Sequence, residues 1–343
     1  MSRLLSDSGV ELPVLAAPMA GGAGTTGLVT AAGRAGSLGF LAGGYKTADA
    51  LADQIRTLQA ADLPFGVNLF AGDPVTISVE EYRRYAGLLQ AEADRYGLKL
   101  NHEAPVEDDD GLAEKLDLVT AADVPWVSFT FGIPDSAAVQ ALRRSGTTVL
   151  QTVTSAEEAR LAEEAGVDGL IVQASSAGGH SGTLTPHLPL SPAALPDLVS
   201  SVRHTTALPL IAAGGIATSA DAAAALRAGA DATMIGTLLL RTDESGASAV
   251  HKQALVDPAF DSTTLTRAFT GRPARALRNH FADRYDPVAP AGYPAVHHLT
   301  AELRKAAASA GDARLVHLWA GTGYRQAKEE PVARTLQRIS ADL

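Results

Sequence analysis

The stretch LPLIAAGGIATSADAAAALRAGADATMIGT at residues 208–237 contains the signals of a strand, a helix and a second strand. Its apolar runs at 208–214 and 232–237 are short and nearly uninterrupted, which is typical of strands buried in a parallel sheet. The alanine-rich segment between them predicts a helix, with Ser219 as its N-cap and Gly229 as the residue that ends it. Strand, helix and parallel strand form the repeating unit of α/β folds.

The same alternation extends back to the N-terminus. Together with the two runs above it gives eight candidate strands, at residues 12–18, 37–43, 64–70, 125–131, 147–153, 168–174, 208–214 and 232–237. The helix expected at 155–166 has the same end signals, with Ser155 as N-cap and Gly166 at its end. Eight strand–helix units predict a closed (β/α)8 barrel of the TIM type rather than an open sheet.

Two regions interrupt this pattern. The connection at 71–124 is long and carries the acidic run EDDDG (107–111), which we interpret as a solvated loop rather than a carboxylate metal site. Beyond residue 243 the alternation stops, and helical stretches take its place. We therefore predict two domains, a ligand-binding barrel at 1–243 and a smaller, mainly helical cap at 244–343 that covers one end of the barrel.

The composition excludes several classes of function. With 46% hydrophobic and 19% charged residues, the chain is an ordinary globular protein, and its net charge of −10 argues against nucleic acid or an anionic membrane as partner. It has no cysteine, which rules out disulfides, thiolate zinc sites and cysteine nucleophiles, including those of the IMP dehydrogenase type of barrel. No apolar run is long enough to span a bilayer, and the N-terminus lacks a signal peptide core. We expect a cytoplasmic protein, monomeric or homodimeric, without a metal.

Glycines follow both of the last two predicted strands. In a TIM barrel a phosphate commonly binds at the loops after strands 7 and 8. The backbone N–H groups of Gly214, Gly215, Gly236 and Thr237 would bind its oxygens, helped by the helix that starts near Ser219. This pattern indicates a phosphorylated ligand, and by itself it fits flavin mononucleotide (FMN) and a sugar phosphate equally well.

The run GAGTTG at 22–27 matches the dinucleotide-binding pattern G-x-G-x-x-G. The second predicted strand, however, ends in Gly43, Gly44 and Tyr45, without the acidic residue that would bind a ribose. Two interpretations remain open: glycine-rich backbone lying beside a flat ligand, and a tight loop between two elements.

The segment VQASSAGGHSGTL at 172–184 follows the sixth predicted strand, where a barrel has its active-site mouth. Gln173 offers a donor and an acceptor to a flavin, and Gly178 and Gly179 allow backbone to approach a flat ring. His180 titrates near neutrality and is suited to proton transfer. We expect the other histidines to be structural, and the pair 297–298 not to bind metal; these histidines are at 102, 187, 204, 251, 280, 297, 298 and 317.

Taken together, these motifs resemble the nitronate monooxygenase family, long called 2-nitropropane dioxygenases. The resemblance rests on LAAPMAGGAGTTGLVTAAGRAGSLGFLAGGY (15–45), GVNLF (66–70), FTFGIP (129–134), VQASSAGGHSG (172–182), AAGGI (212–216), MIGT (234–237), FTGRPARALRN (269–279) and LWAGTGYR (318–325). It implies non-covalent FMN on a TIM barrel. The implied reaction is oxidation of alkyl nitronates, such as propionate 3-nitronate, or of nitroalkanes by O2 to a carbonyl compound and nitrite.

The resemblance also implies roles for particular residues. His180 matches the catalytic histidine of the family, and Tyr324 is expected at the substrate pocket. The expected cofactor-binding residues are Ala17, Pro18, Met19, Asn68, Gln173, Gly178, Gly179, Gly214, Gly215, Met234, Ile235, Gly236 and Thr237. Family members commonly read Glu-Ala-Gly-Gly-His-Arg-Gly around the histidine, whereas this chain has Ser176 and Ser181 in place of Glu and Arg. Both serines are expected at the substrate pocket, where they alter its charge.

Three alternatives stay open. The first is an NAD(P)H-dependent flavin reductase of quinones or enoyl thioesters, and the second is a flavin-binding protein without turnover. Loss of the usual Glu and Arg at positions 176 and 181 favours the second alternative, and retention of His180 argues against it. The third is a barrel that binds another phosphorylated ligand.

Overall fold

The structure, a computed structural model that describes residues 5, 8–72, 74–341 and 343, has a closed barrel of eight parallel strands. These strands are β1 (Val14–Ala16), β2 (Gly39–Ala42), β3 (Phe65–Phe70), β4 (Trp126–Thr130), β5 (Thr148–Val153), β6 (Gly169–Gln173), β8 (Leu210–Ala213) and β9 (Ala232–Ile235). Each lies within one of the eight predicted runs, and β9 pairs in parallel with β1 to close the barrel. The predicted α/β class and TIM-type barrel are confirmed.

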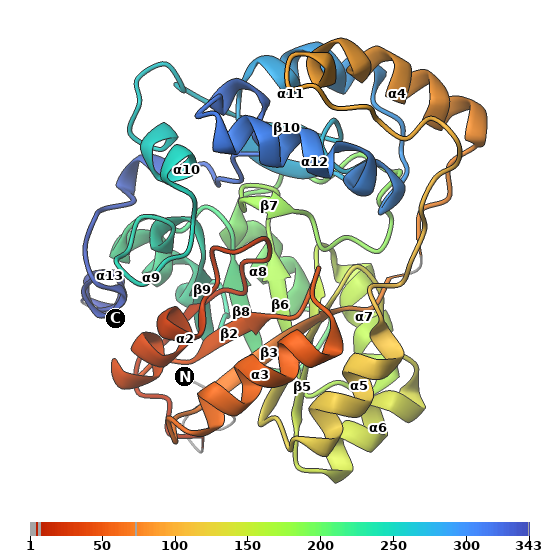
Figure 1. Ribbon diagram of the computed structural model, residues 1–343. Helices are drawn as coiled ribbons and strands as arrows, with labels where there is room; N and C mark the ends of the chain where they lie inside the picture. Colours follow the sequence, from red (N-terminus) through yellow and green to blue (C-terminus); the bar gives the residue numbers. More distant parts are fainter. Residues whose placement is uncertain (1–4, 6–7, 73, 342) are drawn as a thin grey trace.

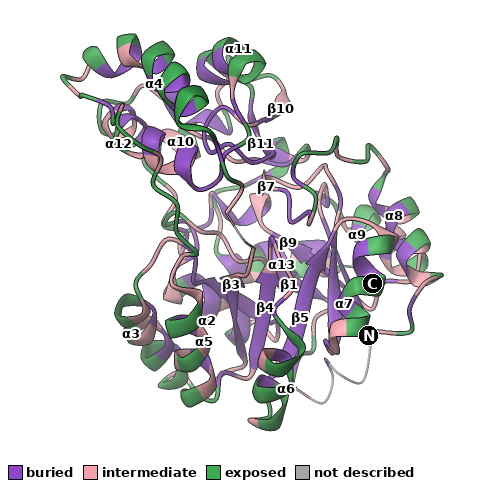
Figure 2. Ribbon diagram, turned by 90° about the vertical axis from the view of Figure 1, so that its right-hand side faces the viewer, coloured by how far each residue is buried: buried purple, intermediate pink, exposed green. Residues whose placement is uncertain are grey.

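Helices surround the barrel (Figures 1 and 2). They are α2 (Thr26–Arg34), α3 (Ala48–Gln59), α5 (Leu112–Ala121), α6 (Ser136–Arg144), α7 (Ala156–Ala165), α8 (Leu195–Arg203) and α9 (Ser219–Arg227). Inside the barrel, strand side chains form a separate buried cluster that includes Phe40, Trp126 and Met234. The barrel is therefore filled by side chains below its mouth, and a ligand site has to lie at one end.

Helix ends follow the sequence signals closely, with one exception. The hydroxyl of Ser155 caps α7, and Gly166 ends that helix with a φ of 89°, as predicted. The N-cap of α9 is Thr218, one residue before the predicted Ser219. Thr218 is preferred because its hydroxyl accepts the N–H of Asp221 while the Asp221 carboxylate accepts the N–H of Thr218, so both ends of a capping box are satisfied.

A second layer covers the mouth of the barrel (Figure 1). It comprises α10 (Ala249–Ala254), β10 (Thr263–Thr266), β11 (Ala274–Leu277), α11 (His280–Tyr285) and α12 (Ala295–Ser309). Strand β11 pairs antiparallel with β10 and also with β7 (Gly179–His180), the short strand that follows β6. This three-stranded sheet joins the predicted active-site segment directly to the cap.

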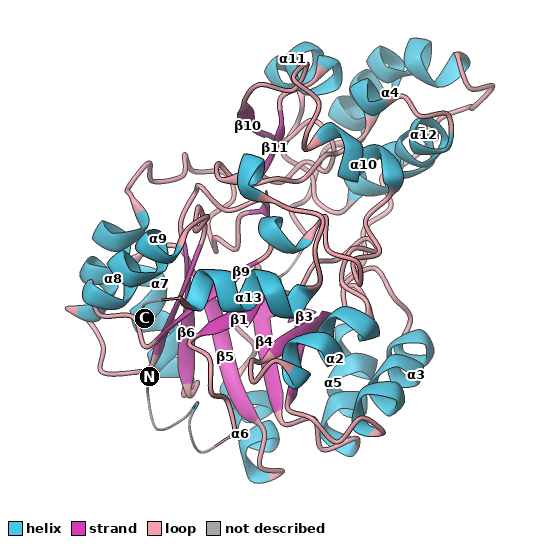
Figure 3. Ribbon diagram, turned by 90° about the vertical axis from the view of Figure 1, so that its left-hand side faces the viewer, coloured by secondary structure: helices cyan, strands magenta, loops and turns pink. Residues whose placement is uncertain are grey.

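Two helices pack against elements that are distant from them in the sequence. Helix α4 (Val79–Asp94), from the long connection, packs against α12, and the Tyr85 hydroxyl donates a 2.6 Å hydrogen bond to the Ala268 carbonyl. Helix α13 (Val332–Ser340) returns to the barrel and contacts α2, α9 and β1 (Figure 3). The domains at 1–243 and 244–343 stay a prediction, and by their contacts α4 belongs with the cap and α13 with the barrel.

The acidic run is less solvated than expected. Asp108 and Asp109 are exposed, but Asp110 forms a 2.6 Å ion pair with the buried Lys115 and accepts the N–H of Tyr45. The described residues contain no cluster of three or more side chains able to hold a metal ion. Within that same part of the chain, every helix is too short or too polar to cross a bilayer.

Candidate active site

A cavity of about 540 Å³ lies between the C-terminal ends of the barrel strands and the cap. This volume is typical of small-molecule and cofactor sites. Its wall includes His180 and every predicted cofactor-binding residue, namely Ala17, Pro18, Met19, Asn68, Gln173, Gly178, Gly179, Gly214, Gly215, Met234, Ile235, Gly236 and Thr237. The sequence motifs therefore converge on one cavity, and their individual roles remain predictions.

His180 is held by backbone pairing and by one side-chain contact. Its strand β7 pairs with β11, with His180 opposite Ala274, and Gly179 reaches this position with a φ of 78°. The imidazole Nε2 lies 2.9 Å from the hydroxyl oxygen of the buried Thr270. The other ring nitrogen, Nδ1, has no hydrogen bond to any described residue and is not sealed from the cavity. The free nitrogen is therefore the one available to a ligand.

The surroundings of His180 keep its imidazole neutral. Burial, together with the positive charges of Arg272 and Arg304, lowers the pKa of His180 to about 3. The side chain keeps a partly exposed surface because it borders the cavity, and protein atoms surround its remaining faces. A neutral imidazole at pH 7 has a lone pair with which it can accept a proton.

Arg272 fixes the loop behind this histidine. It is buried, its Nε lies 3.3 Å from the Ser181 carbonyl oxygen, and its Nη2 donates to the carbonyl of Thr183. The guanidinium carbon lies 4.0 Å from the ring centre of Phe131. Burial lowers the pKa of Arg272 to about 10, which leaves it a cation at neutral pH. Arg272 therefore contributes both packing and positive potential next to the cavity.

The three residues expected at the substrate pocket lie behind the cavity wall instead. Ser181 is buried beneath Arg272, and Tyr324 is buried in the cap, where its hydroxyl donates a 2.7 Å hydrogen bond to the Phe260 carbonyl. Ser176 packs against the backbone of Gly215. None of the three is among the described residues that line the cavity, and their contact with a substrate stays a prediction.

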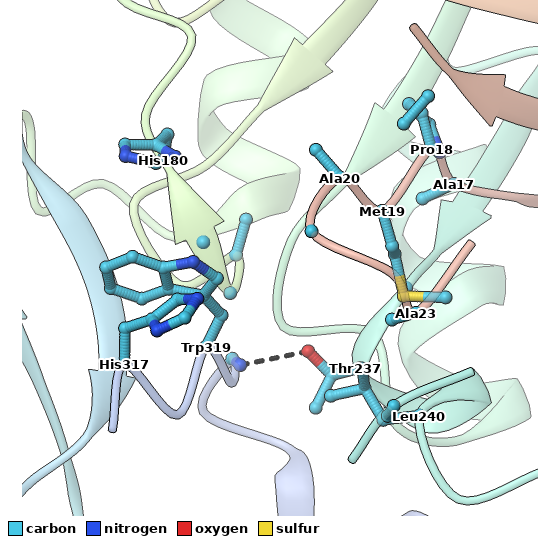
Figure 4. Close-up of a pocket in the computed structure, with 18 of the residues that line it drawn as sticks. Ala17, Pro18, Met19, Ala20, Ala23, His180, Thr237, Leu240, His317 and Trp319 are labelled. Atoms are coloured by element: carbon cyan, nitrogen blue, oxygen red, sulfur yellow. Dashed lines mark hydrogen bonds between the residues drawn. The ribbon is translucent and has the colours of Figure 1, made fainter. Parts of the chain in front are cut away.

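Aromatic residues that the motifs did not single out line the cavity opposite the glycine loops. Tyr45 and Phe131 have positive φ angles of 62° and 80°, which are strained for side chains of this size. The Tyr45 ring stacks on His297 with centres 4.1 Å apart, and the Trp319 ring lies 5.2 Å from His180. In Figure 4 the rings of His180 and Trp319 lie across the cavity from the segment that begins at Ala17.

Three of the histidines expected to be structural also lie on this wall, namely His251, His297 and His317. His297 lies on the same face of α12 as the other residues of that helix that line the cavity. Only the arrangement of the cap over the barrel turns that helix face toward the cavity.

Comparison with known proteins identifies the family. The sequence model of the nitronate monooxygenase family matches residues 2–342. A probable nitronate monooxygenase of Staphylococcus saprophyticus is 36% identical over 92% of this chain and 90% of that protein. A probable nitronate monooxygenase of Staphylococcus aureus is 32% identical over 98% of this chain and 96% of that protein. This chain belongs to the nitronate monooxygenase family.

Two solved structures resemble this chain over nearly its full length. The nitroalkane oxidase of Streptomyces ansochromogenes has 47% sequence identity and a TM-score of 0.93 over 99% of this chain and 97% of that one. FabK from Thermotoga maritima has 26% identity and a TM-score of 0.76 over 99% and 94% of the two chains. The chain is thus a nitronate monooxygenase-type oxidoreductase, and this family is typically flavin-dependent and acts on small molecules.

The glycine loops of this chain have backbone donors suited to a phosphate group. The Gly321 N–H donates a 2.9 Å hydrogen bond to the Thr237 hydroxyl (Figure 4). The C-terminal segment therefore contacts the glycine loop that follows β9. Among the hydrogen bonds of the described residues, none is donated by the backbone N–H groups of Gly215, Gly236 or Thr237. These three donors are available to phosphate oxygens.

Helix α9 contributes less to this site than its position in the sequence indicates. The Asp221 carboxylate accepts the N–H groups of Ala217 and Thr218, at 3.0 and 2.9 Å. A carboxylate thus occupies the positive end of the helix, where the sequence predicted help for the phosphate. The loop N–H groups are therefore better suited to a phosphate than the end of this helix is.

Two amides border the region where a flavin ring would lie. Asn68 donates through Nδ2 to the Ser128 and Thr130 hydroxyls, at 2.9 and 3.0 Å, and its Oδ1 has no protein donor among the described residues. Gln173 donates to the His180 carbonyl and accepts the Gly182 N–H. Asn68 therefore keeps an acceptor for a ring N–H, whereas Gln173 mainly fixes the loop that carries His180.

Proposed function

We propose that this protein is an FMN-dependent monooxygenase that oxidises alkyl nitronates or nitroalkanes with O2 to a carbonyl compound and nitrite. The observation that carries the proposal is His180, a neutral imidazole whose free Nδ1 borders a cavity that also has glycine loops with unpaired N–H donors on its wall. Family membership supports the reaction class. Bound FMN supplies the electron acceptor.

The cofactor would be held by three parts of the chain. Gly215, Gly236 and Thr237 would bind the phosphate through their backbone N–H groups, and Asn68 Oδ1 would accept a ring N–H. The backbone from Ala17 to Met19 would lie along the ring, since it lines the cavity opposite His180 (Figure 4). No carboxylate of the described cavity wall would oppose an anionic cofactor.

The protein's own contribution to the chemistry is proton transfer and charge. His180 Nδ1 takes the α-proton from a neutral nitroalkane, and Nε2 stays bonded to Thr270. General-base assistance of this kind is worth roughly 10² to 10⁴ in rate. The positive charge of Arg272 stabilises the resulting anion, and this anion offsets the cost of the buried imidazolium that forms with it. A nitronate supplied as the anion bypasses the proton removal.

The aromatic side chains exclude water from the reacting centre. Phe131, Tyr293 and Trp319 each lie within 5.2–5.7 Å of the His180 ring, measured between ring centres. In a site with few competing water molecules, the interaction between the substrate anion and the nearby cations is stronger than in bulk solvent.

The proposal is tested on the purified protein. Its visible spectrum and the mass of the released cofactor identify FMN, and propyl 1-nitronate added under air yields nitrite and consumes oxygen. A protein that cannot be reconstituted with FMN contradicts the cofactor assignment. A protein that binds FMN and releases no nitrite contradicts the reaction.

A further inference from the structure

Tyr45 is the only tyrosine among the described residues that line the cavity of about 540 Å³. It lies in the loop that follows β2, and its side chain is half-buried. Burial raises the pKa of Tyr45 to about 12, so its hydroxyl keeps its proton at neutral pH. The described part of the cavity wall therefore carries a single phenol O–H.

The backbone of Tyr45 is held in a costly conformation. Its φ of 62° lies in the left-handed region, which aromatic residues rarely adopt. The Tyr45 N–H donates a 2.9 Å hydrogen bond to Asp110 Oδ1, and the other carboxylate oxygen of Asp110 pairs with the buried Lys115. Strain of this kind persists only where the surrounding structure holds it, and it clusters at sites that bind ligands.

The ring of Tyr45 is fixed from two sides. It stacks on His297 of α12, with ring centres 4.1 Å apart and an angle of 3° between the ring planes. It also makes an edge contact with Phe70 at the end of β3, with ring centres 5.4 Å apart. The position of the phenol oxygen is therefore defined by the protein, which lowers the entropic cost of a hydrogen bond to a ligand.

The Tyr45 hydroxyl has unused donor capacity. The Tyr293 hydroxyl donates a 3.1 Å hydrogen bond to the Tyr45 oxygen, and no described residue accepts the proton of Tyr45. A hydroxyl that accepts a hydrogen bond becomes polarised and is a stronger donor in its turn. Tyr45 can therefore donate to an acceptor bound in the cavity.

Tyr45 borders the same part of the cavity as the proposed base. The Tyr293 ring lies 5.7 Å from the His180 ring, measured between ring centres, and the Tyr293 hydroxyl contacts Tyr45. Tyr45 and His180 both line the cavity. A nitroalkane carries its acidic C–H next to its nitro group, so one molecule can present its carbon to His180 and an oxygen to Tyr45.

We propose that Tyr45 is a catalytic residue that donates a hydrogen bond to a nitro oxygen of the substrate. This inference rests on the proposed function and extends it to recognition of the nitro group. When His180 removes the α-proton, negative charge moves onto the nitro oxygens. A hydrogen bond to a charged acceptor is stronger than one to a neutral acceptor. Tyr45 therefore stabilises the nitronate more than the neutral nitroalkane.

The Tyr45→Phe variant tests this role, because it keeps the ring and removes only the hydroxyl. We measure kcat and KM for nitroethane and for ethyl nitronate by nitrite release, together with the FMN content. Ethyl nitronate binds as an anion, so its KM is expected to rise about 10- to 100-fold with little change in kcat. Nitroethane becomes anionic only in the transition state, so its kcat is expected to fall by a similar factor with little change in KM.

Two further variants sharpen the comparison. Tyr96→Phe removes a hydroxyl that contacts Asp312 outside the cavity, and it is expected to retain the wild-type constants. Tyr293→Phe removes the group that donates to Tyr45 and leaves Tyr45 itself in place. It is expected to change the same two constants in the same directions, by about two- to threefold. Tyr293→Phe also provides the test if Tyr45→Phe does not fold.

Each outcome has a distinct meaning. Wild-type constants in Tyr45→Phe, or in Tyr293→Phe where only that variant folds, overturn the inference. So does an equal fall in kcat for both substrates, which a general disturbance of the cavity wall would cause. Loss of FMN from Tyr45→Phe also overturns it, because the hydroxyl then serves the cofactor. A wild-type protein that turns over neither substrate contradicts the proposed function itself.

Discussion

At the scale of single residues, the central relation is the contact between His180 and Thr270. The Thr270 hydroxyl also lies 3.3 Å from the Arg272 carbonyl, to which it can donate its proton. In that arrangement Nε2 of His180 carries the ring proton and donates to Thr270, so the lone pair is on Nδ1. The loop context of His180 pointed to this histidine in the sequence. Thr270 is 90 residues away, and no local pattern could connect the two.

Replacing His180 by Asn tests the role of the imidazole. We expect kcat for a neutral nitroalkane such as nitroethane to fall by about 10² to 10⁴, since the general base is lost. The pre-formed ethyl nitronate is expected to lose less, because no proton has to be removed. Steady-state nitrite release with both substrates measures the difference. Unchanged nitroethane turnover in His180→Asn, at wild-type FMN content, would remove His180 from the mechanism.

Replacing Thr270 by Val tests the position of the ring. Loss of one hydrogen bond of about 1 kcal/mol predicts a fall in kcat for nitroethane of roughly fivefold, with little change in KM. Thr270→Ser keeps the hydroxyl and is expected to restore kcat. A purely structural role would instead change the turnover of nitroethane and ethyl nitronate equally, so the ratio of the two rates is the deciding measurement.

At the scale of elements, the eight barrel strands could be predicted because each is a short apolar run with a helix after it. The packing partners of α4 and α13 could not be predicted from the sequence. Both helices are amphipathic, and amphipathicity shows that a face is buried without showing which partner covers it. The cap strands β10 and β11 were also missed, since they are short and become strands by pairing with each other and with β7.

The return of α13 to the barrel makes a prediction about stability. Leu336 is fully buried in the same apolar cluster as the barrel strands. Leu336→Ala is expected to lower the free energy of unfolding by about 2 to 5 kcal/mol, because it leaves a cavity between α13 and the barrel. Arg334→Ala, on the exposed side of the same helix, is the matched control. Urea unfolding of the two variants that shows equal, small losses would contradict the docking of α13.

At the scale of the whole molecule, several half-buried histidines on the cavity wall couple protonation to the stability of the fold. Burial lowers the pKa of His251 to about 4 and of His297 to about 2, and it lowers the pKa of His317 well below its usual value. With His180, four neutral imidazoles line one cavity. The sequence identified one of them as functional, because the other three meet only when the cap folds over the barrel.

These shifts predict the direction of the pH dependence. In the unfolded chain a histidine takes up a proton near pH 6.5, whereas in the folded protein these groups stay neutral to about pH 4 or below. The contribution of these histidines to the free energy of unfolding is therefore complete above pH 6.5. As the pH falls below this value, the free energy of unfolding decreases by up to about 1.4 kcal/mol per pH unit for each histidine.

Urea unfolding between pH 6.5 and 4.5 measures this slope. For His251→Gln, the free energy of unfolding is expected to fall less steeply with decreasing pH than for the wild type, by up to about 1.4 kcal/mol per pH unit. His187→Gln, which changes an exposed histidine outside the cavity, is expected to retain the wild-type slope. Equal slopes in all three proteins would show that the cavity histidines do not couple protonation to folding.

The central claim is that a flavin bound in this cavity accepts electrons from a nitronate, and anaerobic mixing of the FMN-loaded protein with each candidate donor tests it most directly. We predict that propyl 1-nitronate bleaches the flavin absorbance in the visible range within the turnover time, and that NADH does not. Rapid bleaching by NADH together with an unchanged spectrum in the presence of the nitronate would contradict the account.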